Sequence, residues 1–188
     1  MNQKSLFWVI VGIVIVFLLY GFSTYNSLVA LNEKVDASLS EIDNQLARAA
    51  DLLPNLEATV KGYAAHEKEI LENIAKARSL MLSAGTVSQR DEAAGELSQL
   101  VGRLLMLTEN YPNLKADARF AQLMDELAGT ANRITVARRD YNEAVRKYNT
   151  RIKTFPTKII AGMFGFTERD YFKAPENART FPKVNFGQ

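Results

Sequence analysis

The sequence predicts an all-α protein in which an N-terminal transmembrane helix leads into an elongated, up-and-down four-helix bundle. Three observations predict this: an uncharged apolar stretch near the N-terminus, apolar residues that recur every three or four positions after it, and turn signals that divide this pattern. Spacings of three and four are the period of an α-helix, and no alternating strand pattern competes with them. A long helical hairpin with kinks at its prolines is the alternative architecture.

Composition excludes several classes of function. The 188 residues allow one domain with a tail, and the 23 basic and 21 acidic side chains nearly balance, so we expect no nucleic-acid partner. The chain has no cysteine, which removes disulfides, thiolate nucleophiles and iron–sulfur clusters.

The first element is the stretch LFWVIVGIVIVFLLYGF, from Leu6 to Phe22, and no charged residue lies between Lys4 and Glu33. Extended to Tyr25, a helix here reaches about 30 Å, the thickness of the hydrocarbon core of a bilayer. An uncleaved anchor is favoured over a signal peptide, whose apolar region is usually shorter and is followed by an A-x-A site. The residues expected to carry the anchor are Leu6, Trp8, Val14, Phe17, Tyr20 and Phe22.

Charges beside the anchor predict its orientation. Lys4 and the amino terminus are positive, whereas the other flank begins with Glu33, Lys34 and Asp36. The positive-inside rule therefore predicts a single-pass protein with its N-terminus in the cytoplasm and the bundle outside the inner membrane. We divide the chain into an anchor (1–25), a helical bundle domain (26–155) and an aromatic-rich C-terminal tail (156–188).

The bundle begins with one long apolar stripe. It runs through Leu28, Leu31, Val35, Leu39, Ile42, Leu46, Ala49, Leu53, Leu56, Val60, Tyr63, Ile70, Ile74, Ala77 and Met81. The pair Ala84-Gly85 ends it. Ser88, with Asp91 three residues later, resembles a capping box and begins the next helix, which NYPNL at 110–114 ends. The last stripe runs from Phe120 to Ile152 and ends at Phe155-Pro156.

Two prolines leave the architecture open. Pro54 lies within the first stripe, and a proline inside a helix costs about 3 kcal/mol because it removes a hydrogen bond and clashes with the preceding turn. Pro54 and Pro112 are either breaks between the helices of a bundle or kinks in a long hairpin with its tip near Gly85. Helices of roughly 35–55 Å suit a four-helix bundle, which we favour.

The tail is rich in aromatic residues. Its segment KIIAGMFGF is too short to span a bilayer, so it covers the end of the bundle or dips into the membrane interface near the anchor. Packing on the bundle is favoured, because such aromatic tails seldom stay exposed. The residues expected to pack are Phe164, Phe166, Tyr171 and Phe172.

Catalytic and metal sites are not expected. His66 is the single histidine, and its HEKEI segment has Ile70 where a zinc HExxH motif needs the second histidine. There is no G-x-S-x-G elbow and no Walker A loop. We therefore expect no catalytic residue, no metal, no cofactor and no small-molecule substrate, and we expect His66 to be a hydrogen-bonded residue at the edge of the apolar stripe.

A Tyr-Asn pair occurs twice at heptad spacing, as Tyr141-Asn142 and Tyr148-Asn149. These side chains could pair across helices and fix their register, as a buried Asn does in coiled coils. The alternative is that each Tyr lies in the core and each Asn is exposed beside it. Together with Leu39, Ile42, Leu46, Pro54 and Tyr63, they form our set of residues for helix packing or register.

Several separate motifs resemble the LemA family of bacterial membrane proteins. They are YNSLVALNEKVDASLSEIDNQLARAADLLPNLEATVKGYAAHE, LMLTENYPNLKADARFAQLMDEL, NRITVARRDYNEAVRKYNTRIKTFP and IAGMFGF…YF, in order over about residues 25–186. The resemblance implies one N-terminal membrane helix, an all-helical bundle and no established biochemical activity. This chain departs from the family pattern at Ser38, Met124 and Ala131, which puts in doubt any role of the family's aromatic, glutamine and glutamate at those positions.

These patterns predict a non-enzymatic scaffold or interaction protein that is anchored in the lipid bilayer and forms a homo-oligomer. The alternative is an accessory or sensory subunit that binds a partner in a membrane protease or signalling complex. An enzyme using His66 or Glu67 is a third, disfavoured class.

Overall fold

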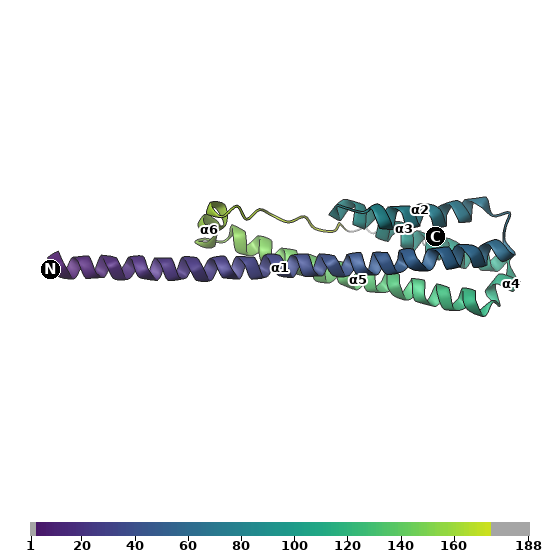
Figure 1. Cartoon of the computed structure of the whole chain (residues 1–188), viewed down its shortest axis with the longest axis horizontal. Coiled ribbons are helices and arrows are strands. Elements are labelled where there is room, and N and C mark those ends of the chain that lie inside the picture. The colour runs from purple at the N-terminus through teal and green to yellow at the C-terminus, as the bar shows by residue number, and fades with distance from the viewer. Residues whose placement is uncertain (1–2, 174–188) are drawn as a thin grey trace, which may run out of the picture. The chain divides into compact units, whose positions relative to one another are not determined.

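The computed structural model describes residues 3–173 and, from Phe7 onward, their side chains. This part of the chain contains helices and no strands, so the predicted all-α class is confirmed. The helices are α1 (Gln3–Tyr63), α2 (Lys68–Ser83), α3 (Val87–Asn110), α4 (Pro112–Lys115), α5 (Ala118–Lys153) and α6 (Thr157–Met163) (Figure 1).

The described residues form two compact units. The first comprises residues 3–39 and 140–170, and the second comprises residues 40–139 and 171–173. Helices α1 and α5 therefore each contribute to both units. The division into anchor, bundle and tail at residues 25 and 155 is based on sequence pattern rather than on contacts, and it stays a prediction.

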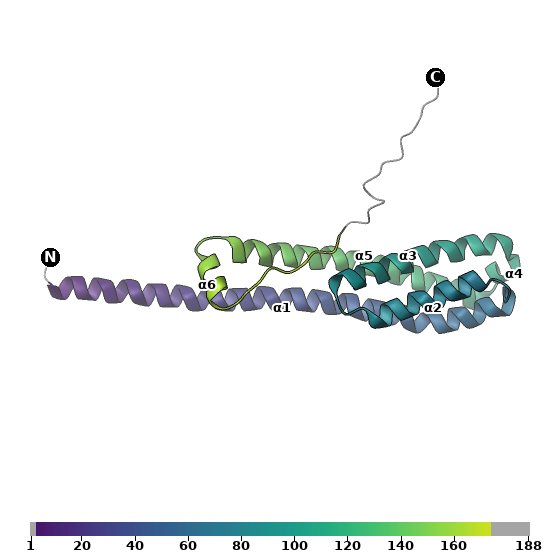
Figure 2. The same cartoon turned by 90° about the horizontal axis from the view of Figure 1, so that it is seen from above.

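The second unit is a helical bundle built from residues 40–63 of α1, from α2, α3 and α4, and from residues 118–139 of α5. Helices α2 and α3 lie side by side in it (Figure 2). Burying each large aliphatic side chain of its core stabilises the fold by about 1.5–3 kcal/mol. The fully buried side chains include Ile42, Leu46, Leu53, Leu56, Val60, Ile74, Leu97, Leu100, Leu104 and Leu127.

Pro54 does not interrupt the helix, so of the two alternatives left open at this residue, a break between helices is excluded. Helix α1 continues through Pro54 to Tyr63, with the proline ring exposed and both Leu53 and Leu56 buried. Burial of these neighbours offsets the cost of about 3 kcal/mol for an internal proline. The chain leaves the helix only after Tyr63, in a turn before α2. Pro112, in contrast, lies in the first turn of α4 and is a break rather than a kink.

The capping box of α3 is formed by a different pair from the one predicted. The Thr86 hydroxyl accepts a hydrogen bond from the Gln89 backbone N–H at 3.2 Å, and Gln89 Oε1 accepts one from the Thr86 N–H at 3.0 Å. Ser88, the predicted cap, already lies inside α3, because the helix begins at Val87. The predicted start was wrong by two residues because Gln89 completes a box as well as an acidic residue does.

The first unit consists of residues 3–39 of α1, residues 140–153 of α5, helix α6 and the segment after it. Its core lies where α1, α5 and α6 meet, and two small polar side chains, Thr24 and Thr157, are buried with it. The buried apolar side chains are Leu28, Val35, Tyr141, Ala144, Val145, Tyr148, Ile152, Ile160 and Ala161.

Candidate functional site: the membrane segment and the tail beside it

The N-terminal part of α1 presents an uncovered apolar surface. Trp8 is 70% exposed and Phe22 is 72% exposed; Val14 and Phe17 are also exposed, and Tyr20 is half-buried. Leu6 belongs to the same helix, but its side chain is outside the described ones. Among the described residues, α1 is the one helix long and apolar enough to cross a membrane. A core helix of a water-soluble protein would be buried, whereas this surface is suited to lipid.

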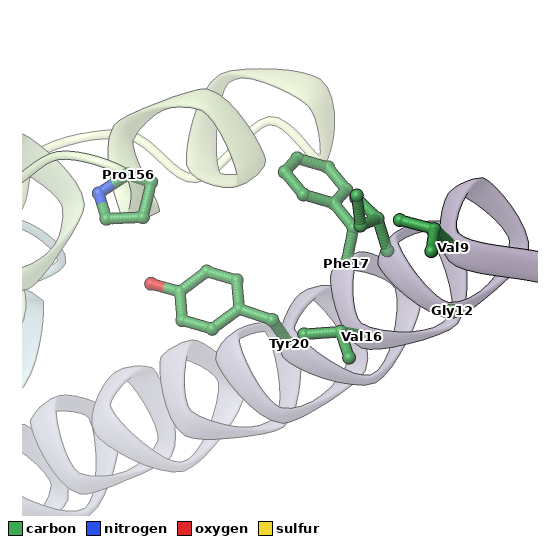
Figure 3. A pocket seen from close by; sticks show the side chains of 7 residues that line it. Val9, Gly12, Val16, Phe17, Tyr20 and Pro156 are labelled. Carbon is green, nitrogen blue, oxygen red and sulfur yellow. The ribbon is translucent and has the colours of Figure 1, made fainter. Parts of the chain in front are cut away.

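Two apolar grooves follow this segment. The first groove has a volume of about 630 Å³, and Val9, Val16 and Phe17 line it on the side of α1. Figure 3 shows the Tyr20 hydroxyl pointing across this groove toward Pro156. The second, of about 350 Å³, is lined by Phe17, Leu18, Gly21, Phe22 and Tyr25 of α1 and by Ile160, Met163 and Phe164 at α6. No charged side chain lines either groove, so neither resembles a site for polar chemistry.

A glycine turn holds the aromatic residues that follow α6. Gly165 has a φ of 74°, a left-handed conformation that glycine adopts without steric cost, and the Phe166 N–H donates to the Ala161 carbonyl at 3.0 Å. This hydrogen bond is the Schellman type of helix end. The turn brings both Phe164 and Phe166 onto Tyr25, with ring centroids 4.8 Å and 5.8 Å apart respectively.

In the first unit, the extended segment beyond this turn is bound by buried side chains of α5. Asn149 is only 3% exposed; its Nδ2 donates to the Arg169 carbonyl at 2.8 Å and its Oδ1 accepts from the Arg169 N–H at 2.9 Å. The buried Tyr141 hydroxyl donates to the Asp170 carbonyl at 2.9 Å. Arg169 also forms an ion pair with Asp36 of α1. These contacts satisfy tail backbone groups that have no helix or sheet partner.

In the second unit, the tail contributes one buried aromatic ring. Phe172 lies under the Arg138 guanidinium, whose central carbon is 5.3 Å from the ring centroid, a distance typical of a cation–π interaction. Arg138 also forms an ion pair with Asp91 and donates to the Lys173 carbonyl at 3.0 Å.

The tail residues that were expected to pack therefore differ in their surroundings. Phe172 is buried, Phe166 is half-buried, and Phe164 is exposed although it contacts Tyr25; Tyr171 is exposed. The predicted tail also extends to residue 188, and its part beyond residue 173 lies outside the described residues.

The residues proposed for helix packing or register also differ in how deeply they are buried. Ile42, Leu46, Tyr141 and Tyr148 are in the core, while Leu39 and Asn142 are half-buried and Pro54 is exposed. Asn149 is buried and binds the tail backbone rather than a side chain of another helix. Each member keeps its predicted role in packing or register as a hypothesis.

Two tyrosines of the second unit donate hydrogen bonds to carboxylates that lie directly before helices α2 and α5. Tyr63, which is exposed, donates to Asp117 at 2.8 Å, and Tyr111 donates to Glu67 at 2.7 Å. Each bond to the carboxylate raises the pKa of the tyrosine. The pKa of Asp117 is lowered, first by the Phe120 backbone N–H, which donates to it at 2.8 Å, and then by the Tyr63 hydroxyl.

His66 is exposed in the turn between α1 and α2, not at the edge of the apolar stripe as expected. The stripe is interrupted here because α1 ends at Tyr63. Its neighbour Glu67 is the residue before α2 and is bound by Tyr111. Within the described part of the chain, no group of three or more histidine or acidic side chains could hold a metal ion.

Sequence reasoning missed Asp117, Tyr111 and Arg138. Asp117 could have been found, since an aspartate directly before a helical stripe is a strong N-cap signal. Arg138 and Tyr111 act through partners far away in sequence, so no local pattern indicates them.

Comparison with known proteins identifies the family. Residues 38–186 match the sequence profile of the LemA family. Magnetosome proteins MamQ 1 and MamQ 2 of Paramagnetospirillum magneticum are each 25% identical to this chain over an aligned length of 175 residues, and the match covers 79% of this chain and 64% of the relative. Protein LemA of Metamycoplasma hominis is 25% identical over an aligned length of 155 residues, and this match covers 82% of this chain and 71% of the relative. This chain thus spans less than two thirds of the length of the MamQ proteins. Because the family profile covers most of its residues, the chain belongs to the LemA family.

Proposed function

We propose that this protein is a non-enzymatic scaffold, anchored in the membrane, that associates with further copies of itself. The observation that carries the proposal is the continuity of α1. Its apolar, exposed segment and the core residues of the second unit, from Ile42 to Val60, belong to one helix without an intervening linker. Such a helix attaches the helical body to the membrane by the chain itself.

Exposed apolar side chains outside the membrane segment support self-association. Leu105 and Met106 on α3, Leu82 on α2 and Val136 on α5 are each about half exposed or more. Helical proteins with surplus apolar surface tend to cover it with other helices. The magnetosome proteins among the relatives are named for a cellular location rather than for a reaction, which is compatible with a structural role.

The membrane is proposed to be the bacterial inner membrane, with the N-terminus in the cytoplasm. Lys4 on one flank against Glu33 and Asp36 on the other supports this orientation. A reporter that is active only outside the cytoplasm, fused after Gln188, tests it. Fluorescence of a reporter that matures only in the cytoplasm, from the same position, would reverse the orientation.

The decisive experiment is cross-linking in native membranes, followed by mild extraction, sizing and mass spectrometry. A scaffold gives a large particle composed mainly of this chain. The double variant Leu105→Glu/Met106→Glu should shrink that particle, whereas Gln99→Glu/Asn110→Glu, which adds the same charge at exposed positions of α3, should not. If one foreign membrane protein dominates the particle instead, self-association is refuted. The protein is then an accessory subunit of that partner.

A further inference from the structure

Helix α6 presents an apolar face that the rest of the first unit leaves uncovered. Thr157, Ile160 and Ala161 are buried, at the spacings of three and four that define one side of a helix. On the other side Ile159 and Met163 are exposed, Met163 by 75%. Phe155 just before the helix is 80% exposed, and Phe164 just after it is 59% exposed although its ring contacts Tyr25 of α1. A seven-residue helix with such a face is unsuited to water.

This face is continuous with the membrane segment of α1. The 350 Å³ groove is lined by Phe17, Leu18 and Phe22 of α1, by the buried Ile160 of α6, and by Met163 and Phe164. Helix α6 therefore lies beside the C-terminal turns of the apolar stretch that ends at Phe22, where α1 would leave the hydrocarbon if it crosses a bilayer. Both views show α6 beside this part of α1 (Figures 1 and 2).

We propose that α6 is an interfacial membrane helix, so that Phe155, Ile159, Met163 and Phe164 enter the outer part of the bilayer alongside α1. The occupant of this surface is lipid, because the same groove is lined by the side chains of α1 that face the acyl chains. Lys158, exposed on α6, is placed to reach lipid phosphates while its methylenes remain in the apolar layer. The proposal rests on the anchoring of α1 in the membrane, which belongs to the proposed function.

Fluorescence quenching by brominated lipids tests whether α6 enters the membrane, and the experiment uses the full chain. The reporter carries Met163→Trp in a Trp8→Phe background, and it is reconstituted into phosphatidylcholine and phosphatidylglycerol vesicles with bromines at shallow or deep acyl positions. The wild-type chain, whose single tryptophan is Trp8, reports on the anchor. A third protein, Asn132→Trp in the Trp8→Phe background, reports on an exposed position of α5 in the second unit. Because residues 132 and 163 are exposed, neither substitution disturbs the core.

An interfacial helix predicts that shallow bromines reduce the emission of the residue-163 reporter about twofold, as expected for a side chain 5–10 Å into the interface, and deep bromines reduce it less. The residue-132 reporter should be unaffected. If Trp8 is quenched but the residue-163 reporter behaves like the residue-132 reporter, α6 is not in the membrane and the inference is refuted while the anchor stands. If Trp8 is not quenched either, both the anchor and this inference fail.

Quenching by a water-soluble molecule provides a second, independent test of the same proposal. Acrylamide dissolved in the water should quench the residue-163 reporter much less in vesicles than it quenches the residue-132 reporter. Equal quenching of the two would contradict membrane insertion. Phe155→Trp in the Trp8→Phe background should repeat the residue-163 result, which guards against a local effect of one substitution.

Discussion

Tyr63, the last residue of α1, donates a hydrogen bond to Asp117, the residue that caps α5. The two residues are 54 positions apart in sequence, and their bond closes the end of the second unit at which α1 stops. Asp117 accepts hydrogen bonds from two donors at once, the Phe120 N–H and the Tyr63 hydroxyl, and both lower the pKa of its carboxyl group. We therefore expect Asp117 to make a pH-dependent contribution to stability.

Replacing Asp117 tests that contribution. Asp117→Ala should lower the melting temperature at neutral pH more than Tyr63→Phe does, because it removes the cap as well as the tyrosine bond.

A carboxyl group whose pKa is lowered by folding stabilises the fold above its unfolded-state pKa, and the stabilisation is lost as pH falls through the lowered pKa. Thermal melts from pH 7 down to pH 2 should therefore show the difference between wild type and Asp117→Asn shrinking with acidification. A difference that stays constant over this range would contradict the assignment.

Asn149 should hold the tail on α5. Asn149→Ala leaves the Arg169 backbone N–H and carbonyl without their partner and should lower the free energy of unfolding by about 1–3 kcal/mol. Limited proteolysis should then cut after Arg169 or Lys173 faster than in the wild type. Asn132→Ala, an exposed position of the same helix, is the matched control and should change neither quantity. Equal proteolysis of both variants would show that Asn149 does not retain the tail.

Pro54 should be a position where alanine stabilises the protein. An internal proline costs a helix about 3 kcal/mol, and its rigidity in the unfolded chain returns less than 1 kcal/mol of this. Because α1 continues through the residue, we expect Pro54→Ala to raise the free energy of unfolding by about 1–2 kcal/mol. Chemical denaturation followed by circular dichroism measures the change. Were Pro54 a true break between helices, the substitution would be neutral or destabilising.

The start of α3 can be tested by comparing two neighbouring hydroxyl residues. Thr86→Ala removes the side-chain half of the capping box and should cost about 1 kcal/mol, the typical value for loss of an N-cap. Ser88→Ala, inside the helix, should be neutral or slightly stabilising because alanine has the higher helix propensity. Denaturation midpoints of the two variants decide the assignment, and the reverse order would restore Ser88 as the cap.

The helices themselves were predictable because their signals are local. Apolar periodicity predicted the stripes of α1, α3 and α5, and the Ala84-Gly85 pair predicted the end of α2. The uncharged N-terminal stretch predicted the candidate membrane helix. The same local reasoning left Pro54 open between a break and a kink. Its cost is visible in the sequence, whereas the burial of Leu53 and Leu56 that offsets it exists only after the helices pack.

The sequence by itself determined the class of this protein: an all-helical member of the LemA family with an apolar N-terminal segment and no recognisable catalytic motif. Only the tertiary structure decided where the tail lies and which side chains hold it. Asn149 with Arg169, Arg138 with Phe172 and Tyr63 with Asp117 are pairs between residues distant in the chain. Helix periodicity depends on residues that are only a few positions apart in the sequence. Contacts between distant residues depend instead on how separate helices pack together, and a single sequence contains no local signal for that packing.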